Sequence, residues 1–327
     1  MKRREVLGGL AALSAAGAIT PARAQAPAWP TRTINMIVPF PPGGQGDLAA
    51  RPVAIAMERI LGQSVIVENR GGAGGAVGNA AVARAEPDGY TLLMTLSSLA
   101  VLPEADRLFG RRPAYEVEQL QPIGRVLADP TLLAVPASAP WKTLADFVAA
   151  AKAQPEKIPY GSSGPYGTLH VSMEMFAKAA DIRLVHVPYR GAGPALNGLL
   201  GGQIQALASA PGVLKPHVES GAIRVLANWG GTRVPAFPDV PTFKELGYSD
   251  VEFYIWAGLF APKGIPDAVR SRLEAALAQA MRDPDVVRTF ETAGSPPAYQ
   301  PPAEFTQFVA QDSARLIAAT QKIGKVE

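Results

Sequence analysis

Short apolar runs alternate along the chain with longer segments in which apolar residues recur every three or four positions. The runs predict β-strands, and the periodic segments predict α-helices. We predict strands at residues 34–40, 65–68, 90–95, 132–136, 158–160, 184–188, 204–208, 223–227 and 257–261, and helices near residues 48–61, 76–85, 143–153, 168–180, 193–201, 266–282 and 303–323. Strands joined by helices indicate an α/β fold with parallel sheets, which bind ligands at the carboxyl ends of their strands.

The turn after the first predicted strand has the composition of a small-anion site. Residues 38–47 run from the strand through two prolines and three glycines into a helix. Glycine lets a ligand approach the main chain, and a helix start supplies free N–H groups and a positive dipole end. Pro52 predicts that this helix begins later than Asp47 suggests, or bends. The candidate ligand-binding residues here are Phe40, Pro42, Gly43, Gly44, Gln45, Gly46 and Asp47.

Four further turns at strand ends are rich in glycine, serine and proline. Their hydroxyl and main-chain N–H groups can donate hydrogen bonds to a ligand, although turn formation alone also explains these residue types. The longest, residues 160–168, opens a helix as the first turn does. From the four turns we select Ser97, Ser98, Ser162, Ser163, Gly164, Tyr166, Gly167, Thr168, Gly191, Ala192, Gly193 and Ser209.

The glycine-rich residues 71–78 have neither the Lys-Ser/Thr ending of a phosphate-binding loop nor G-x-G-x-x-G spacing. We interpret them as a place where small residues let the following helix pack closely on the sheet.

The N-terminus has the parts of a secretory signal peptide. Basic residues 2–4 precede an apolar run over residues 6–19, and Ala22-Arg23-Ala24 supplies a cleavage site after Ala24. We therefore expect residues 1–24 to direct export to the periplasm. The pair Arg3-Arg4 leaves both the twin-arginine route and the general secretory route open.

Charge and composition restrict the classes of partner and of metal site that the mature chain can have. The signal segment holds four basic residues and one acidic residue, which account for the whole net charge of +3. A neutral mature chain without a basic cluster argues against nucleic acid as a partner. The absence of cysteine excludes disulfides and thiolate metal sites. A mature chain of about 300 residues exceeds the usual size of one core, so we expect two domains.

Two enzyme classes, a dinucleotide-binding oxidoreductase and a hydrolase, are alternatives to a binding protein. Residues 44–49 fit G-x-G-x-x-A, and Glu68 follows at the distance typical of dinucleotide-binding folds, which makes an exported dinucleotide-binding oxidoreductase the alternative function. Pro41-Pro42 lengthen that turn and weaken the match. No G-x-S-x-G motif is present, and His170, His186 and His217 are isolated in sequence. We therefore expect no catalytic residue, no cofactor and no metal.

Several motifs together resemble those of the tripartite tricarboxylate transporter substrate-binding proteins, also called Bug receptors. The resemblance covers almost the whole mature chain. It rests on residues 37–44 (IVPFPPGG), 67–70 (VENR) with 72–75 (GAGG), 87–92 (PDGYTL), 160–162 (YGS), 185–191 (VHVPYRG) and 238–242 (PDVPT).

The resemblance implies a type II periplasmic-binding-protein fold, in which two α/β lobes close over a ligand cleft. It places residues 25–125 in lobe 1, residues 126–228 in lobe 2 and residues 229–327 in the return to lobe 1. It also implies a small organic carboxylate held through main-chain N–H groups at the first and third turns, membrane transporter subunits as partners, and a monomer.

Two departures from the family pattern bear on the ligand. Gln45-Gly46 stand where many members have a hydroxyl residue, and Ala208-Ser209-Ala210 stand where many have Asp or Asn. The missing acid removes a partner for an ammonium group, so we expect weak binding of amino acids. The aromatic rings of Phe40 and Tyr166 are candidates to flank an apolar or aromatic carboxylate.

Overall fold

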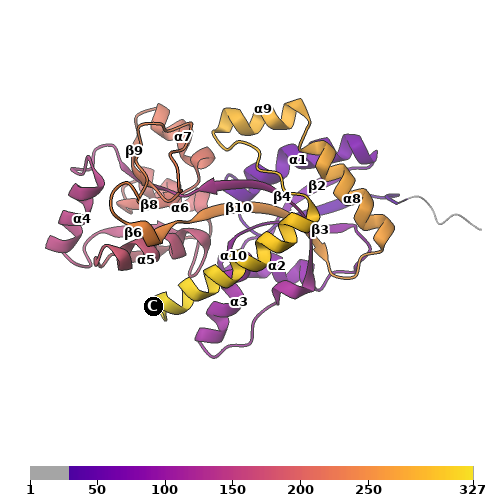
Figure 1. The fold of residues 1–327 in the computed structure, drawn as a ribbon, viewed down its shortest axis with the longest axis horizontal. Helices are drawn as coiled ribbons and strands as arrows, with labels where there is room; N and C mark the ends of the chain where they lie inside the picture. The colour runs from indigo at the N-terminus through magenta and orange to yellow at the C-terminus, as the bar shows by residue number, and fades with distance from the viewer. Residues whose placement is uncertain (1–28, 327) are drawn as a thin grey trace, which may run out of the picture.

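The computed structural model describes residues 29–326 and shows two α/β lobes side by side (Figure 1). The predicted signal peptide lies outside the described residues. The strands are β1 (Ile34–Val38), β2 (Val65–Asn69), β3 (Thr91–Leu96), β4 (Leu120–Pro130), β5 (Leu132–Pro136), β6 (Pro159–Ser162), β7 (Val185–Pro188), β8 (Ala206–Ser209), β9 (Ile223–Asn228) and β10 (Tyr254–Pro262). The helices are α1 (Gln45–Leu61), α2 (Ala76–Ala83), α3 (Ser98–Leu108), α4 (Leu144–Ala153), α5 (Thr168–Ala179), α6 (Ala192–Leu200), α7 (Pro211–Glu219), α8 (Asp267–Ala280), α9 (Pro284–Ala293) and α10 (Pro302–Ile323).

Each lobe is built on one five-stranded sheet, with strand orders β2-β1-β3-β10-β4 and β7-β6-β8-β5-β9. In the first sheet, β1 runs parallel to β2 and β3, while β10 is antiparallel to β3 and β4. The second sheet repeats this plan around β6, with β5 as its antiparallel strand. The carboxyl ends of β1 and β6 therefore lead into equivalent turns, which open α1 and α5.

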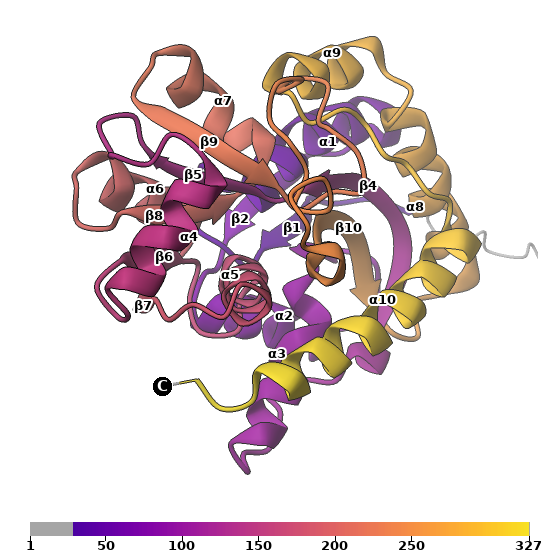
Figure 2. The same cartoon turned by 60° about the vertical axis from the view of Figure 1, so that its left-hand side comes forward.

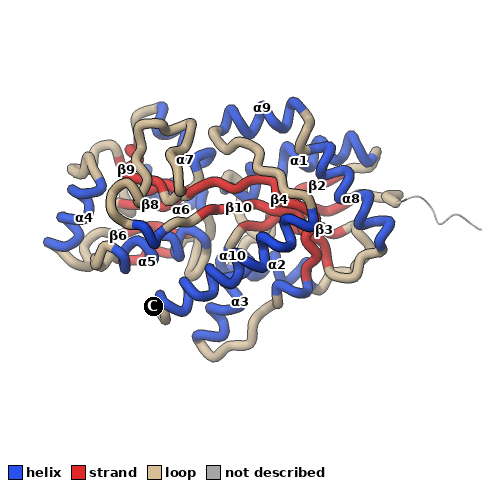
Figure 3. The backbone as a smooth tube through the Cα atoms, viewed as in Figure 1, coloured by secondary structure: helices blue, strands red, loops and turns tan. Residues whose placement is uncertain are grey.

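Two strands of the first sheet carry the chain between the lobes, as Figure 3 shows for the continuous red path of β4 and β10. Thr131 joins β4 to β5, and its N–H donates to the carbonyl of Phe253 at 3.3 Å. The Trp229 N–H donates to the carbonyl of Thr131 at 2.8 Å, and the Phe253 N–H donates to the carbonyl of Trp229 at 3.0 Å. Because β4 stays in the first sheet as far as Pro130, we propose Thr131 as the first lobe boundary instead of residue 125.

The C-terminal helix α10 packs on lobe 1 and reaches lobe 2. It contacts α3, β4 and α5, and Figure 2 shows the C-terminal end of α10 below α5. The carbonyl of Lys322 accepts a hydrogen bond from Lys178 of α5. Within residues 29–326 no helix is both long and apolar enough to cross a membrane.

The sequence patterns did not predict four elements, which are β4, α3, α7 and α9. The edge strand β4 contains Pro122 and Pro130, which edge strands tolerate. Proline also interrupts the apolar period of α3 and α7, at Pro103 and Pro216. Only Val286 and Phe290 are buried in α9, too few to give a clear period.

The prediction for the start of the first helix is wrong. α1 begins at Gln45, before Asp47, and continues through Pro52 to Leu61. Gly44 precedes it with extended backbone angles, and its carbonyl accepts the N–H groups of Asp47 and Leu48 at 3.0 Å. The first turn is therefore closed without help from Pro52, whose missing N–H affects only the next turn.

Candidate functional site

A small cavity of about 20 Å³, room for one water molecule, lies between the two lobes. Eight of the predicted residues line it: Phe40, Gly44, Gln45, Gly46, Ser163, Thr168, Ala192 and Ser209. Four apolar residues that sequence reasoning missed complete the lining: Leu96, Leu169, Ala210 and Ile255. The structure thus brings together residues from all five predicted turns or their immediate neighbours.

The lobes touch around this cavity. A Cβ built on Gly44 in lobe 1 would lie 3.6 Å from the Cβ of Ala192 in lobe 2. A Cβ on Gly191, whose φ is +145°, would lie 2.3 Å from Cγ of Pro41. Gly164 also lies close to lobe 1, since a Cβ there would lie 3.2 Å from the N atom of Gly74. Glycine at these turns permits this close approach, so the structure is a closed form.

Three of the helices that begin at the cavity have glycine as the N-cap residue and no capping side chain. Gly44, Gly167 and Gly191 are the N-cap residues of α1, α5 and α6, and none makes a side-chain cap hydrogen bond. The first N–H groups of a helix have no intrahelical acceptor, and the helix dipole adds positive potential there. No Lys, Arg or His is among the residues that line the cavity. An anion in this cavity would therefore be held by main-chain amides rather than by a cationic side chain.

Polar side-chain atoms in the lining are buried and lack partners. The Oγ atoms of Ser163 and Ser209 and the Oε1 atom of Gln45 make no hydrogen bond within residues 29–326. The three side chains belong to residues that are at most 6% exposed. A buried polar group without a partner costs about 1–3 kcal/mol. The two hydroxyls are therefore available donors for a ligand in the cavity.

The carboxylate of Asp47 points into its own lobe, not into the cavity. It accepts hydrogen bonds from Gly43 N at 3.1 Å, from Asn69 Nδ2 at 3.0 Å, and from Nε and Nη2 of Arg51 at 3.0 and 2.8 Å. Burial opposes its ionisation, but the bonds from Arg51, Gly43 and Asn69 outweigh burial and lower its pKa. Asp47 thus braces the first turn, in which Gly43 has a φ of +79°.

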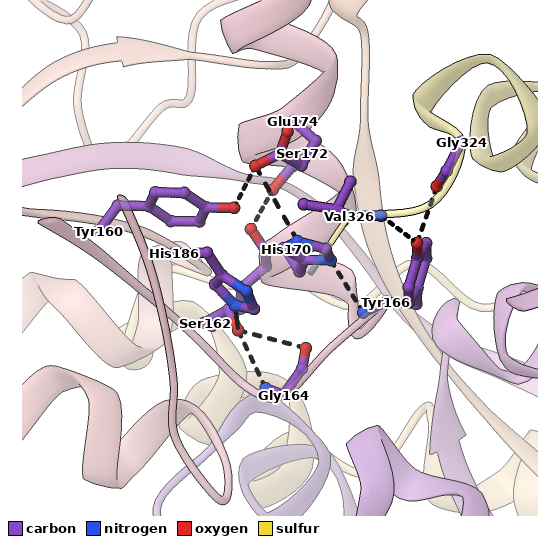
Figure 4. Close-up of polar contacts among 11 residues, drawn as sticks. Tyr160, Ser162, Gly164, Tyr166, His170, Ser172, Glu174, His186, Gly324 and Val326 are labelled. Carbon is purple, nitrogen blue, oxygen red and sulfur yellow. Dashed lines mark hydrogen bonds and ion pairs between the residues drawn. The ribbon is translucent and has the colours of Figure 1, made fainter. Parts of the chain in front are cut away.

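Ser162 likewise braces the third turn (Figure 4). Its Oγ bonds to Nε2 of His186 at 2.6 Å and accepts from Gly164 N at 3.1 Å. The ring of His186 stacks on His170 with centroids 4.1 Å apart, and Nδ1 of His170 accepts from Tyr166 N at 2.9 Å. Burial lowers the pKa of His170 to about 3, helped by His186, and burial lowers that of His186 to about 4. Both rings are neutral near pH 7 and serve as hydrogen-bonding supports.

Tyr166 faces away from the cavity. Its hydroxyl donates to the carbonyl of Gly324 at 2.7 Å and accepts from Val326 N at 2.8 Å, as Figure 4 shows. Its ring packs edge-on against Phe109, at a centroid distance of 5.9 Å. Tyr166 therefore ties lobe 2 to the C-terminal segment and does not line this cavity, whereas Phe40 does.

The remaining predicted residues lie behind the lining. Ser97 and Ser98 are fully buried at the start of α3, where Ser98 Oγ donates to Gly74 O at 3.4 Å and Ser97 Oγ has no partner within the described chain. Pro42 and Gly193 meet across the lobes, since a Cβ on Gly193 would lie 3.1 Å from the Pro42 carbonyl oxygen.

The packing interpretation of residues 71–78 is confirmed. A Cβ on Gly78 of α2 would lie 2.7 Å from Cβ of Pro39 and 2.8 Å from the carbonyl oxygen of Arg70. Glu68, the acidic residue of the dinucleotide interpretation, instead pairs with Arg70 at 2.5 Å on the surface. In the described part of the chain, no three His, Cys, Asp or Glu side chains gather as metal ligands.

Sequence reasoning also missed Asp129, a buried acid beside the cavity. It lies on β4 opposite Ile255 of β10, and Ile255 lines the cavity. Its carboxylate accepts a hydrogen bond from Nε2 of Gln45. Burial raises the pKa of Asp129 to about 7, although Ser295 and Gln45 favour its charged form. No motif surrounds Asp129, because its place beside the cavity depends on strand pairing.

Known proteins resemble this chain over most of its length. A family model described as the tripartite tricarboxylate transporter family receptor matches residues 49–325. Protein BugT of Bordetella pertussis (strain Tohama I / ATCC BAA-589 / NCTC 13251) is 34% identical over 95% of this chain and 95% of BugT. A solved structure described as that of a periplasmic transporter matches with a TM-score of 0.86 at 38% identity, over 90% of this chain and 98% of that chain.

Two similar structures carry a ligand in their description. An R. palustris protein with adipate has a TM-score of 0.85 at 29% identity, and the match covers 90% of this chain and 98% of that chain. MatC from Rhodopseudomonas palustris with bound malate has a TM-score of 0.83 at 28% identity, and the match covers 89% of this chain and 99% of that chain.

Proposed function

Because the chain belongs to the tripartite tricarboxylate transporter receptor family, we propose that it captures a small organic carboxylate in the periplasm by closure of its two lobes. A receptor of this family binds solutes and is not an enzyme, so the alternative of a dinucleotide-binding oxidoreductase is wrong. The type II periplasmic-binding-protein-like fold agrees with the match of this chain to a solved periplasmic transporter structure at a TM-score of 0.86.

The convergence of three uncapped helix starts on one cavity carries this proposal. Because the cavity has room for only one water molecule in this form, the lobes would stand slightly further apart around a ligand. Main-chain N–H groups from α1 in lobe 1 and from α5 and α6 in lobe 2 would then donate to the same carboxylate. Hydroxyls of Ser163 and Ser209 would add donors. Since the donors belong to both lobes, a bound carboxylate links them and shifts the population toward the closed form.

Closure explains how capture is signalled. In the closed form Pro41 of lobe 1 lies against Gly191 of lobe 2, so a surface that spans both lobes exists only after closure. We propose that integral-membrane transporter subunits recognise this surface and that the receptor works as a monomer. The lobes would separate around the hinge at Thr131, because the connecting strands meet there.

A ligand screen tests the proposal. Small molecules released from the denatured mature protein are identified by mass spectrometry, and adipate, malate, aspartate, glutamate and NADH are compared by thermal shift. We expect a carboxylate without an ammonium group to stabilise the protein by about 2.7 kcal/mol at 100 times its Kd. The single variants S163A and S209A should each weaken that ligand about 10- to 100-fold, since a hydrogen bond to a charged group contributes about 1.5–3 kcal/mol. Stabilisation by NADH alone would contradict the proposal.

Replacing Tyr166 by phenylalanine provides a matched test of which residues face the ligand. Tyr166→Phe removes both hydrogen bonds to the C-terminal segment. It is expected to lower the free energy of unfolding by about 1 kcal/mol and to leave Kd for the ligand within about twofold. Urea denaturation and isothermal titration calorimetry measure the two quantities. A tenfold weaker Kd with unchanged stability would place Tyr166 at the ligand.

A further inference from the structure

Asp129 and Gln45 form a buried polar pair where the hinge strands meet the cavity. Asp129 lies on β4 and is 3% exposed, while Gln45 is the first residue of α1 and is also 3% exposed. Nε2 of Gln45 donates to Oδ2 of Asp129. Gln45 lines the cavity, so its amide separates the buried acid from the ligand space.

No opposite charge compensates Asp129. The groups that act on its carboxyl are the Gln45 amide from α1 and the Ser295 hydroxyl from the segment after α9. Ile255 of β10 stands opposite it in the sheet and is apolar. Lys, Arg, His and other acids are absent from the described groups that influence it. A charge on this carboxyl is therefore opposed by burial and favoured only by the hydrogen bond from Gln45 and by the nearby Ser295 hydroxyl, whose Oγ makes no hydrogen bond within residues 29–326.

The Gln45 amide is oriented unfavourably for an anionic ligand. Its Nε2 is engaged with Asp129, and its Oε1, the other atom of the amide, is buried with no partner within residues 29–326. A carboxylate in the cavity would meet this acceptor oxygen and would also approach the charge of Asp129. Two anions separated only by an amide in a closed, buried space repel strongly.

We propose that the receptor takes up one proton on Asp129 when it binds its carboxylate, with the Gln45 amide turning by half a rotation between the two states. After the turn, Nε2 of Gln45 donates to the ligand and its Oε1 accepts from the protonated carboxyl of Asp129. Both hydrogen bonds are then satisfied, and the buried site gains one negative charge and one proton. This inference rests on the proposed function, because it requires an anionic ligand.

The sign of the pH dependence follows from the proton uptake. Burial in the closed form raises the pKa of Asp129 to about 7, and the ligand anion raises it further. Above the free pKa, affinity for the carboxylate falls as pH rises, by about tenfold per pH unit when one proton is taken up. A ligand with an ammonium group near Asp129 would show the opposite sign, since it favours the charged acid.

Calorimetry on the mature protein tests the inference. Kd is measured for malate and for adipate between about pH 6.5 and 9, where both acids are fully ionised, and in buffers with different ionisation enthalpies at one pH. The wild type is expected to take up close to one proton per ligand well above pH 7, with Kd rising about tenfold per pH unit. Asp129→Asn keeps a donor for Gln45 Oε1 and should bind with a pH-independent Kd.

The control variant is Glu174→Gln. Glu174 is another carboxyl whose pKa is raised by burial, but it lies against Tyr160 inside lobe 2, away from the cavity. This variant should keep the wild-type pH profile. A pH-independent Kd in the wild type, or no proton uptake, overturns the inference and leaves the receptor proposal intact. If no carboxylate binds at any pH, the proposed function fails and the inference fails with it.

Discussion

Replacing Gly44 by leucine is expected to weaken ligand binding at least 100-fold while the protein stays folded. Gly44 has an extended backbone with φ of −91°, which any residue adopts. A Cβ there would already lie 3.6 Å from Cβ of Ala192 in the opposite lobe. The further atoms of leucine have no room until the lobes separate, so the variant would be held open. Binding that needs donors from both lobes would then be lost.

Gly44→Ala is the matched control for this variant. It makes the same change at the N-cap of α1, but its Cβ fits at an ordinary van der Waals distance from Ala192. We expect its Kd to stay within about tenfold of the wild type, because an N-cap change costs at most about 1 kcal/mol when the original residue is glycine. Calorimetry gives Kd, and small-angle scattering gives the radius of gyration with and without ligand. If the leucine variant closes normally, the claim that Gly44 lies against Ala192 in the closed form is wrong.

Local sequence patterns predicted the part of the cavity lining that depends on turns. Glycine at residue 44 and serine at residues 163 and 209 follow apolar strands, and in a parallel sheet such positions lie at the ligand edge. These assignments need only the order of strand, turn and helix. For the same reason the predicted helix starts at α5 and α6 agree with the structure to within one residue.

Positions that depend on packing between distant parts of the sequence were not predicted. Asp129 and Gln45 are 84 residues apart in sequence and meet only because β4 pairs with β10 next to α1. Tyr166 and Ser162 follow the same turn pattern as Ser163, yet their side chains turn toward the C-terminal segment and His186. Which way a side chain in a turn points depends on backbone angles, such as the φ of +55° at Tyr166, that composition does not reveal.

Removing the carboxylate of Asp47 is expected to destabilise the fold. Asp47→Ala leaves Gly43 N without its acceptor and frees Arg51, while Asn69 keeps a bond to the Phe40 carbonyl at 3.0 Å. We expect the free energy of unfolding to fall by about 1–3 kcal/mol, because the buried carboxylate and its charge-assisted hydrogen bonds are lost. Kd should weaken about tenfold, since the turn that carries Gln45 becomes looser.

The pH dependence of Asp47→Ala separates this bracing role from direct ligand contact. The folded pKa of Asp47 lies below its ordinary value, because its hydrogen bonds outweigh burial. Its stabilisation is therefore complete above the unfolded pKa of about 4 and is lost as pH falls through the folded pKa. Urea denaturation should show wild type and variant converging below about pH 4 and differing fully at pH 7. Asp47→Asn keeps an acceptor without charge and should lie between them. A variant with weaker binding but wild-type stability at pH 7 would instead place the Asp47 carboxylate on the ligand.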